Sequence, residues 1–239
     1  MRRWILVPLV LLAVGSGAVL PAAAQSTEDP FGPNKTSRTD VKGAIEDSIR
    51  FLMIEHAIRI GFQEKTREGL KGPFFSDYHR SVRIPGQWGD TDSWVTNYIG
   101  HPGQGAATGF IWLNHSPEAA LPFSKSREYL NSRLRATAFA AGYSVQFEIG
   151  PLSEASIGNV GMNPRTAGWV DYVATPAGGF GIMIAEDLLD KFVIQKVEDR
   201  TDSRVVRALM RMFLNPSRTT ANVSAMRAPW YRVGRSLSQ

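Results

Sequence analysis

The stretch that decides the fold runs from Asp92 to Gly109 and reads D-S-W-V-T-N-Y-I-G-H-P-G-Q-G-A-A-T-G. Asn97 and His101 stand four residues apart in it, a spacing that places two side chains on one face of a helix. Pro102 follows at once and lacks a backbone donor, so we expect the helix to kink or restart there. The run of small residues after the proline predicts a thin surface on which a second helix can pack closely.

A related stretch recurs from Asp171 to Gly179 and reads D-Y-V-A-T-P-A-G-G. When Asn97 is aligned with Asp171, the prolines of the two stretches coincide, and Gly105 coincides with Gly179. Each copy has a polar residue, a second polar residue one turn later, a proline and then small residues. We therefore predict two proline-kinked, glycine-rich central helices that form a pseudo-repeat and pack face to face.

The hydrophobic periodicity of the remaining chain predicts an all-α bundle of about five helices in a domain over residues 41–214. Asp40 is a suitable N-cap for the first of them, which is expected to run to about Arg67. An apolar stripe with helical spacing predicts the buried face of this helix: Ile45, Ile49, Leu52, Met53, His56 and Ile60. The other helices are expected at 93–115, 126–149, 166–197 and 201–214.

The first 24 residues have the pattern of a secretory signal peptide, with two arginines, an apolar core from Trp4 to Val14 and a small-residue cleavage site ending at Ala24. Residues 25–40 are rich in proline, glycine and polar side chains and are expected to form a disordered linker. This arrangement predicts an exported, periplasmic protein that is peripheral to the outer membrane. The absence of cysteine excludes disulfides and thiolate metal sites.

Several ionisable and polar residues fall in or beside apolar or small-residue segments, where an unpaired charge is costly to bury. They are His101, Glu148, Glu154 and Asp171, with Asn97 and Thr175 beside them. We expect them to meet, either as a buried network that fixes helix packing or as an acid–base pair in which a carboxylate orients His101. Zinc binding through His101, Glu148 and Asp171 is a third alternative, but the four scattered histidines do not predict it, and no cofactor is expected.

Arginine dominates the C-terminal region. From Arg204 to Gln239 there are seven arginines, no lysine and no acidic residue. The helical spacing of Arg204, Arg207 and Arg211 predicts a shared outward face, with Val205, Leu209 and Phe213 on the bundle, and Arg218 lies in an irregular tail over 215–239. Such a face is either an ordinary solvated surface or a docking site for lipid phosphates, which match the planar guanidinium group. Export argues against a nucleic-acid partner.

Five motifs stand in one order along the chain. They are Asn97-x-x-x-His101-Pro102-x-x-Gly105, Glu148 with the following Pro151-x-Ser153, Asp171-x-x-x-Thr175-Pro176-x-Gly178-Gly179, Asn215-Pro216-Ser217-Arg218 and Pro229-Trp230-Tyr231-Arg232. This set resembles a family of exported bacterial envelope proteins of unknown function, over roughly residues 88–232. The resemblance implies an envelope location but no activity, substrate or cofactor.

No uninterrupted apolar run in residues 25–239 is long enough to cross a bilayer, which takes about 20 residues. Docking on a membrane surface, or partial insertion, fits the sequence better than spanning. The first functional hypothesis is therefore a binding or scaffolding module attached to a membrane surface or to an envelope membrane protein. The alternative is an enzyme that modifies lipids or envelope polymers with His101 and a carboxylate as acid and base.

Overall fold

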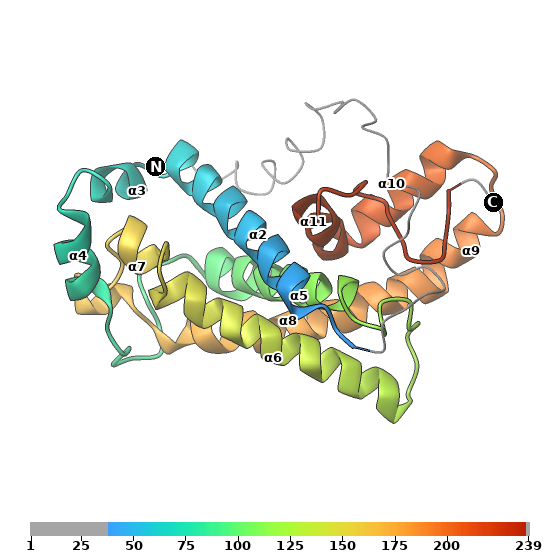
Figure 1. Ribbon diagram of the computed structural model, residues 1–239, viewed down its shortest axis with the longest axis horizontal. Helices are drawn as coiled ribbons and strands as arrows, with labels where there is room; N and C mark the ends of the chain where they lie inside the picture. The colour runs from blue at the N-terminus through green and yellow to red at the C-terminus, as the bar shows by residue number, and fades with distance from the viewer. Residues whose placement is uncertain (1–37, 238–239) are drawn as a thin grey trace. The chain divides into compact units, whose positions relative to one another are not determined.

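The computed structural model describes residues 38–237, and this part of the chain is all-α and contains no strand (Figure 1). The α-helices are α2 (Val41–Phe62), α3 (Glu64–Gly69), α4 (Phe74–Ser81), α5 (His101–Asn114), α6 (Arg127–Ile149), α7 (Glu154–Ile157), α8 (Trp169–Leu189), α9 (Gln195–Glu198), α10 (Arg204–Leu214) and α11 (Pro216–Ser224). Two π-helical turns, Thr96–Gly100 and Asp190–Ile194, precede α5 and follow α8. The predicted fold class is confirmed. The expected signal peptide and most of the expected linker lie outside the described residues.

Two of the long helices, α2 and α6, begin at residues whose side chains cap them. The Asp40 side chain accepts a hydrogen bond from the Gly43 amide at 3.0 Å, which satisfies one of the free amides at the start of α2. The Ser126 hydroxyl does the same for the Tyr129 amide at the start of α6. Short helices α3, α4, α7 and α11 occupy segments that the sequence assigned to loops, to the tail or to the end of the first helix. The observed helices are therefore more numerous than expected.

Helices α5 and α8 pack against each other through their glycines, as the pseudo-repeat predicts. A Cβ atom built on Gly179 would lie 2.6 Å from the main-chain carbon of Gly105, so the two backbones touch. One built on Gly178 would lie 2.6 Å from Cγ of Pro102. Only residues without side chains permit this approach, and it holds the start of α5 against the first half of α8.

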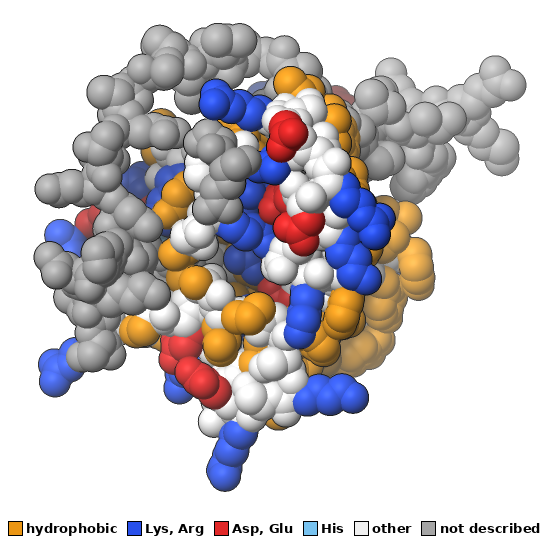
Figure 2. Space-filling view, turned by 90° about the vertical axis from the view of Figure 1, so that its right-hand side faces the viewer, with side chains coloured by type: hydrophobic (Ala, Val, Ile, Leu, Met, Phe, Trp, Pro, Cys, Tyr) orange, Lys and Arg blue, Asp and Glu red, His pale blue; other side chains and the backbone are white. Residues whose placement is uncertain are grey.

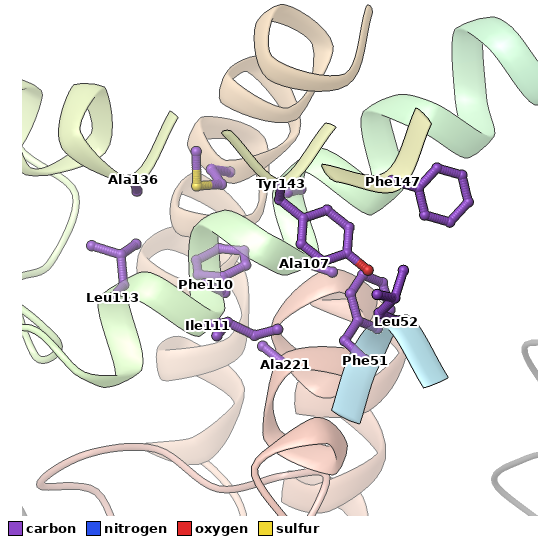
Figure 3. Close-up of a cluster of buried hydrophobic side chains, with 12 residues drawn as sticks. Phe51, Leu52, Ala107, Phe110, Ile111, Leu113, Ala136, Tyr143, Phe147 and Ala221 are labelled. Carbon is purple, nitrogen blue, oxygen red and sulfur yellow. The ribbon is translucent and has the colours of Figure 1, made fainter. Parts of the chain in front are cut away.

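A hydrophobic cluster lies beside this contact (Figure 3). Phe110 and Ile111 of α5 are fully buried at its centre. The surrounding residues come from α2, α6, α8 and α11 and include Phe51, Leu52, Ala136, Tyr143, Phe147, Met183 and Ala221. The cluster joins helices from both ends of the described chain.

The predicted buried face of α2 is wrong in part. Leu52 and His56 are buried, but Ile45, Ile49, Met53 and Ile60 are exposed. The inner face instead carries Asp47 and Arg59, which find charged partners: His115 Nε2 lies 2.7 Å from Asp47 Oδ2, and Arg59 Nη2 lies 3.0 Å from Glu154 Oε1. Polar groups can be buried on this face because other helices supply their partners.

The C-terminal region is not irregular throughout. Helix α11 spans Pro216–Ser224, and Glu186 of α8 accepts hydrogen bonds from its first amides, those of Ser217 at 2.8 Å and Arg218 at 3.2 Å. Asn222 then holds the following segment by donating to the main-chain oxygens of Pro229 and Tyr231 at 2.9 and 3.0 Å. Acids on α8 therefore organise the basic end of the chain.

Candidate functional site

Three helices bring His101, Glu148 and Asp171 together. His101 begins α5, Glu148 lies in the last turn of α6, and Asp171 lies in the first turn of α8. All three are buried, with exposed fractions of 7%, 6% and 4%. One nitrogen or oxygen atom of each lies within 4.8 Å of the other two, and His101 Nε2 is 3.2 Å from Asp171 Oδ1. The expected meeting of these residues is present, and we call this group the polar centre.

Thr175 fixes the orientation of the His101 ring. Its hydroxyl donates to the main-chain oxygen of Asp171 at 2.7 Å, and the same Oγ1 lies 3.3 Å from His101 Nδ1. Since the hydroxyl proton is already used, Oγ1 accepts a hydrogen bond from Nδ1–H. In the neutral ring, the Nε2 lone pair then faces Asp171.

Asn97 is placed differently from its expected position. The turn that contains it is π-helical, with a hydrogen bond from the His101 amide to the Thr96 carbonyl, so Asn97 and His101 are no longer one α-helical turn apart. This turn precedes Pro102, which has no amide to continue the α-helical ladder. Asn97 Nδ2 instead donates to Asp90 Oδ1 at 2.8 Å, and Asp90 is one of the acids that raise the pKa of Asp171. Asn97 therefore reaches the polar centre through Asp90.

The polar centre is rich in acids and poor in nearby cations. Burial, Asp90 and Glu154 raise the pKa of Asp171 from its ordinary value of 3.8 to about 9. Burial, Glu154 and Asp171 raise the pKa of Glu148 well above 4.5. Two carboxyl groups that share one buried site cannot both ionise without a positive partner, so they hold protons near neutral pH.

Glu154 lies outside the polar centre and forms an ion pair with Arg59 of α2. Phe147 separates this pair from His101: its ring stacks on His56 at 5.7 Å, and the His101 ring meets it edge-on at 6.4 Å. His56 is 2% exposed and bonds the Leu152 carbonyl, as expected of a core histidine. Glu154 thus acts on the polar centre through its charge.

The sequence did not predict three residues that lie in or near the site: Asp90, Arg59 and Glu55. Asp90 lies in a glycine-flanked segment that gave no helical signal. Glu55 receives hydrogen bonds from Tyr143 Oη at 2.6 Å and Gln104 Nε2 at 3.1 Å, and burial raises its pKa to about 8. In the sequence, Glu55 and Arg59 stand on the first helix close to His56, and this was the available sign that they are buried. The local sequence does not determine which face of the helix turns inward.

The predicted arginine face on α10 is wrong. Arg207 and Arg211 are 8% and 1% exposed, and only Arg204 faces outward. Arg211 Nε bonds Glu198 at 2.5 Å, and its Nη1 donates to the Trp230 and Arg235 carbonyls at 3.2 and 3.1 Å. Glu198 of α9 and main-chain carbonyls of Thr201 and of the tail draw these arginines inward.

Arg218 is also an internal residue. Its Nη2 bonds Asp187 Oδ1 at 2.7 Å, and its guanidinium lies 4.2 Å from the centre of the Phe110 ring. Arg133 bonds the other oxygen of Asp187 at 2.8 Å. Arg207, Arg211 and Arg218 therefore stabilise the folded C-terminal region and do not form a phosphate-binding surface.

Comparisons of the chain with protein-family models, with curated proteins and with solved structures find no match.

Proposed function

We propose that this chain is an exported envelope module that docks on a membrane surface through the outward apolar faces of its helices. The observation that carries the proposal is the reversed burial of α10. The signal-peptide pattern of residues 1–24 and the family resemblance support the envelope location.

Helix α10 turns its polar side inward and its apolar side outward. Val205, Leu209 and Phe213 are 67%, 44% and 60% exposed, whereas Arg207 and Arg211 are buried. In water the opposite arrangement is favoured, because burying one such apolar side chain contributes about 1.5–3 kcal/mol. An apolar environment outside the protein would remove this conflict. A band of hydrophobic side chains is visible along the right-hand side of Figure 2.

The same reversal occurs on other helices. Buried charged or polar residues include Asp47 and Arg59 on α2, Arg133 and Glu148 on α6, and Asp171, Glu186 and Asp187 on α8. Large apolar side chains are exposed on the same three helices: Ile45, Ile49 and Met53; Leu130, Leu134 and Val145; Trp169, Val173 and Leu189. Ionisable groups inside and apolar groups outside, with small residues between helices, are typical of proteins in contact with lipid.

An exposed aromatic cluster indicates the headgroup region of a bilayer as the environment. Trp88, Trp94, Tyr98 and Trp169 are each at least 43% exposed. The Trp94 and Tyr98 rings lie 5.6 Å apart, and Trp88 Nε1 donates to Tyr98 Oη at 3.2 Å. Amphipathic rings of this kind settle at membrane–water interfaces.

The described residues include no helix long and apolar enough to cross a membrane. A helix that lies in the membrane interface needs only one apolar face. Docking on the membrane surface therefore fits these helices. The net charge, +5 for the whole sequence and +3 without Arg2 and Arg3 of the expected signal peptide, favours anionic lipid.

The experiment is vesicle co-sedimentation of protein purified from the cells that export it, with phosphatidylcholine alone and with added phosphatidylglycerol. Changing Val205, Leu209 and Phe213 to Ser should reduce the bound fraction severalfold, because the outward face of α10 loses its apolar area. A matched control changes the exposed pair Lys42 and Glu46 of α2 to Ser and should bind as the wild type does.

Two results would count against lipid docking: equal binding by the α10 variant and the wild type, or no binding by either. If the protein instead sediments with native envelope membranes and loses this binding when they are treated with protease, the partner is a membrane protein. Far-UV circular dichroism of the variant excludes unfolding as the cause.

The meeting of His101, Asp171 and Glu148 favours a second candidate, an enzyme that modifies lipids or envelope polymers. His101 and a carboxyl group that holds a proton near neutral pH are a donor and acceptor pair at contact distance. Their burial requires the site to open toward a substrate. Loss of turnover of lipid or glycan substrates in His101→Ala, with docking retained, would support this candidate, and absence of any turnover in the wild type would exclude it.

A further inference from the structure

We propose that His101, Glu148 and Asp171 form a binding site for a divalent transition-metal ion such as Zn²⁺ or Mn²⁺. The sequence left zinc binding through these three residues as an alternative that the four scattered histidines did not predict. The inference is independent of membrane docking and concerns the interior of the bundle.

The groups of the polar centre that face one another are hydrogen-bond acceptors. With Nδ1–H donated to Thr175, the neutral His101 ring presents the Nε2 lone pair to Asp171 Oδ1, 3.2 Å away. Asp171 Oδ1 is buried and has no hydrogen-bond partner. Within residues 38–237 no hydrogen bond satisfies the Glu148 carboxylate either, although it is 6% exposed. Acceptors that converge in this way need shared protons or a cation between them.

Asp171 and Glu148 are acids with exposed fractions of only 4% and 6%, and the nearby Arg59 already pairs with Glu154 at 3.0 Å. A divalent cation bound between the two carboxylates would offset the cost of burying their charges. Without a cation, buried carboxyl groups without hydrogen-bond partners lower the stability of the fold.

Thr175 orients two of the ligands. Thr175 holds His101 through Nδ1, the ring nitrogen that does not face the acids. The same Thr175 hydroxyl donates to the main-chain oxygen of Asp171 at 2.7 Å, so one residue contacts both ligands. Hydrogen bonds to the far side of metal ligands commonly fix their tautomer and direction.

The donor set selects the class of ion. One imidazole nitrogen with two carboxylates suits Zn²⁺, Mn²⁺ or Fe²⁺ better than Mg²⁺ or Ca²⁺, which prefer oxygen alone. The three donor atoms lie within 4.8 Å of one another, and Zn²⁺ bonds of about 2.0–2.2 Å would draw them closer. Rotation of the Glu148 side chain can shorten these distances, because no hydrogen bond holds its carboxylate.

The test is isothermal titration of the chelator-treated, lipid-free full chain with ZnCl₂ and MnCl₂, with MgCl₂ for comparison. We expect about one Zn²⁺ per chain in the wild type, and a Kd at least ten- to a hundredfold weaker in Glu148→Gln and Asp171→Asn, which keep side-chain size. His79→Ala, which removes an exposed histidine, should leave the Kd unchanged.

Visible absorption of added Co²⁺ gives a second readout on the wild type. Bands of a protein-bound ion that disappear on competition with Zn²⁺ would support the site. Thermal unfolding supplies a third, since a bound ion raises the unfolding midpoint of the wild type and not of the variants. Absence of Zn²⁺ and Mn²⁺ binding by the folded wild type, or equal affinity in the wild type and both carboxyl variants, would overturn the proposal. Since no membrane is present, neither result depends on docking.

Discussion

Gly105 of α5 lies directly against Thr175 of α8: a Cβ atom added at Gly105 would stand 1.8 Å from the Thr175 carbonyl oxygen. Both neighbours are helix backbone, so neither can move aside without separating the helices. Gly105→Ala should therefore lower the free energy of unfolding by about 1–3 kcal/mol through overpacking. Urea denaturation measures this. Gly103→Ala on the same helix is the matched control, since nothing lies within 4 Å of its added Cβ, and it should be neutral or slightly stabilising.

The Thr175 hydroxyl should determine which nitrogen of His101 carries the proton. Nitrogen NMR of the wild type is expected to show the Nδ1–H tautomer wherever the His101 ring is neutral. Thr175→Val keeps the shape but removes the acceptor, so the tautomer population should change, whereas Thr175→Ser should preserve it. An unchanged spectrum in Thr175→Val would mean that another group orients the ring.

Glu55 should make stability fall as pH rises. Burial raises its folded-state pKa from 4.5 to about 8, so between these values the folded state holds a proton that the unfolded state has lost. Stability should decline by up to about 1.4 kcal/mol per pH unit across that window. Glu55→Gln keeps an acceptor for Tyr143 and should flatten the profile measured by denaturation at successive pH values. Equal slopes in both proteins would show that Glu55 ionises freely in the fold.

Arg211 should be a structural residue. It joins Glu198 to the carbonyls of the C-terminal segment, so Arg211→Gln removes these buried hydrogen bonds and leaves Arg235 as the remaining charged partner of Glu198. The change should lower stability by about 1–3 kcal/mol. Arg204→Gln on the outward side of α10 should change stability by less than about 0.5 kcal/mol. Limited proteolysis offers a second check, because the segment after α11 should become cleavable only in the Arg211 variant.

Much of the candidate site could be anticipated. Polar residues inside small-residue segments had to find one another, and His101, Asp171, Glu148 and Thr175 do so. Asn97 was misplaced because a π-helical turn before Pro102 changes the spacing on which its position was predicted. Glu55 and Asp90 were missed because their importance comes from Tyr143 and Asp171, which are distant in the chain.

By itself the sequence determined the helical class, the starts of α2 and α6 and the close contact of α5 with α8. The two helix starts depend on local hydrogen bonds to the side chains of Asp40 and Ser126. The contact of α5 with α8 depends on the spacing of glycines, which have no side chain to hold the two backbones apart. Only the tertiary structure decided which faces of α2 and α10 turn inward. The reason is that the direction of an amphipathic helix depends on the partners it meets, and here Glu154 and Glu198 on other helices draw Arg59 and Arg211 into the interior and leave the apolar residues outside.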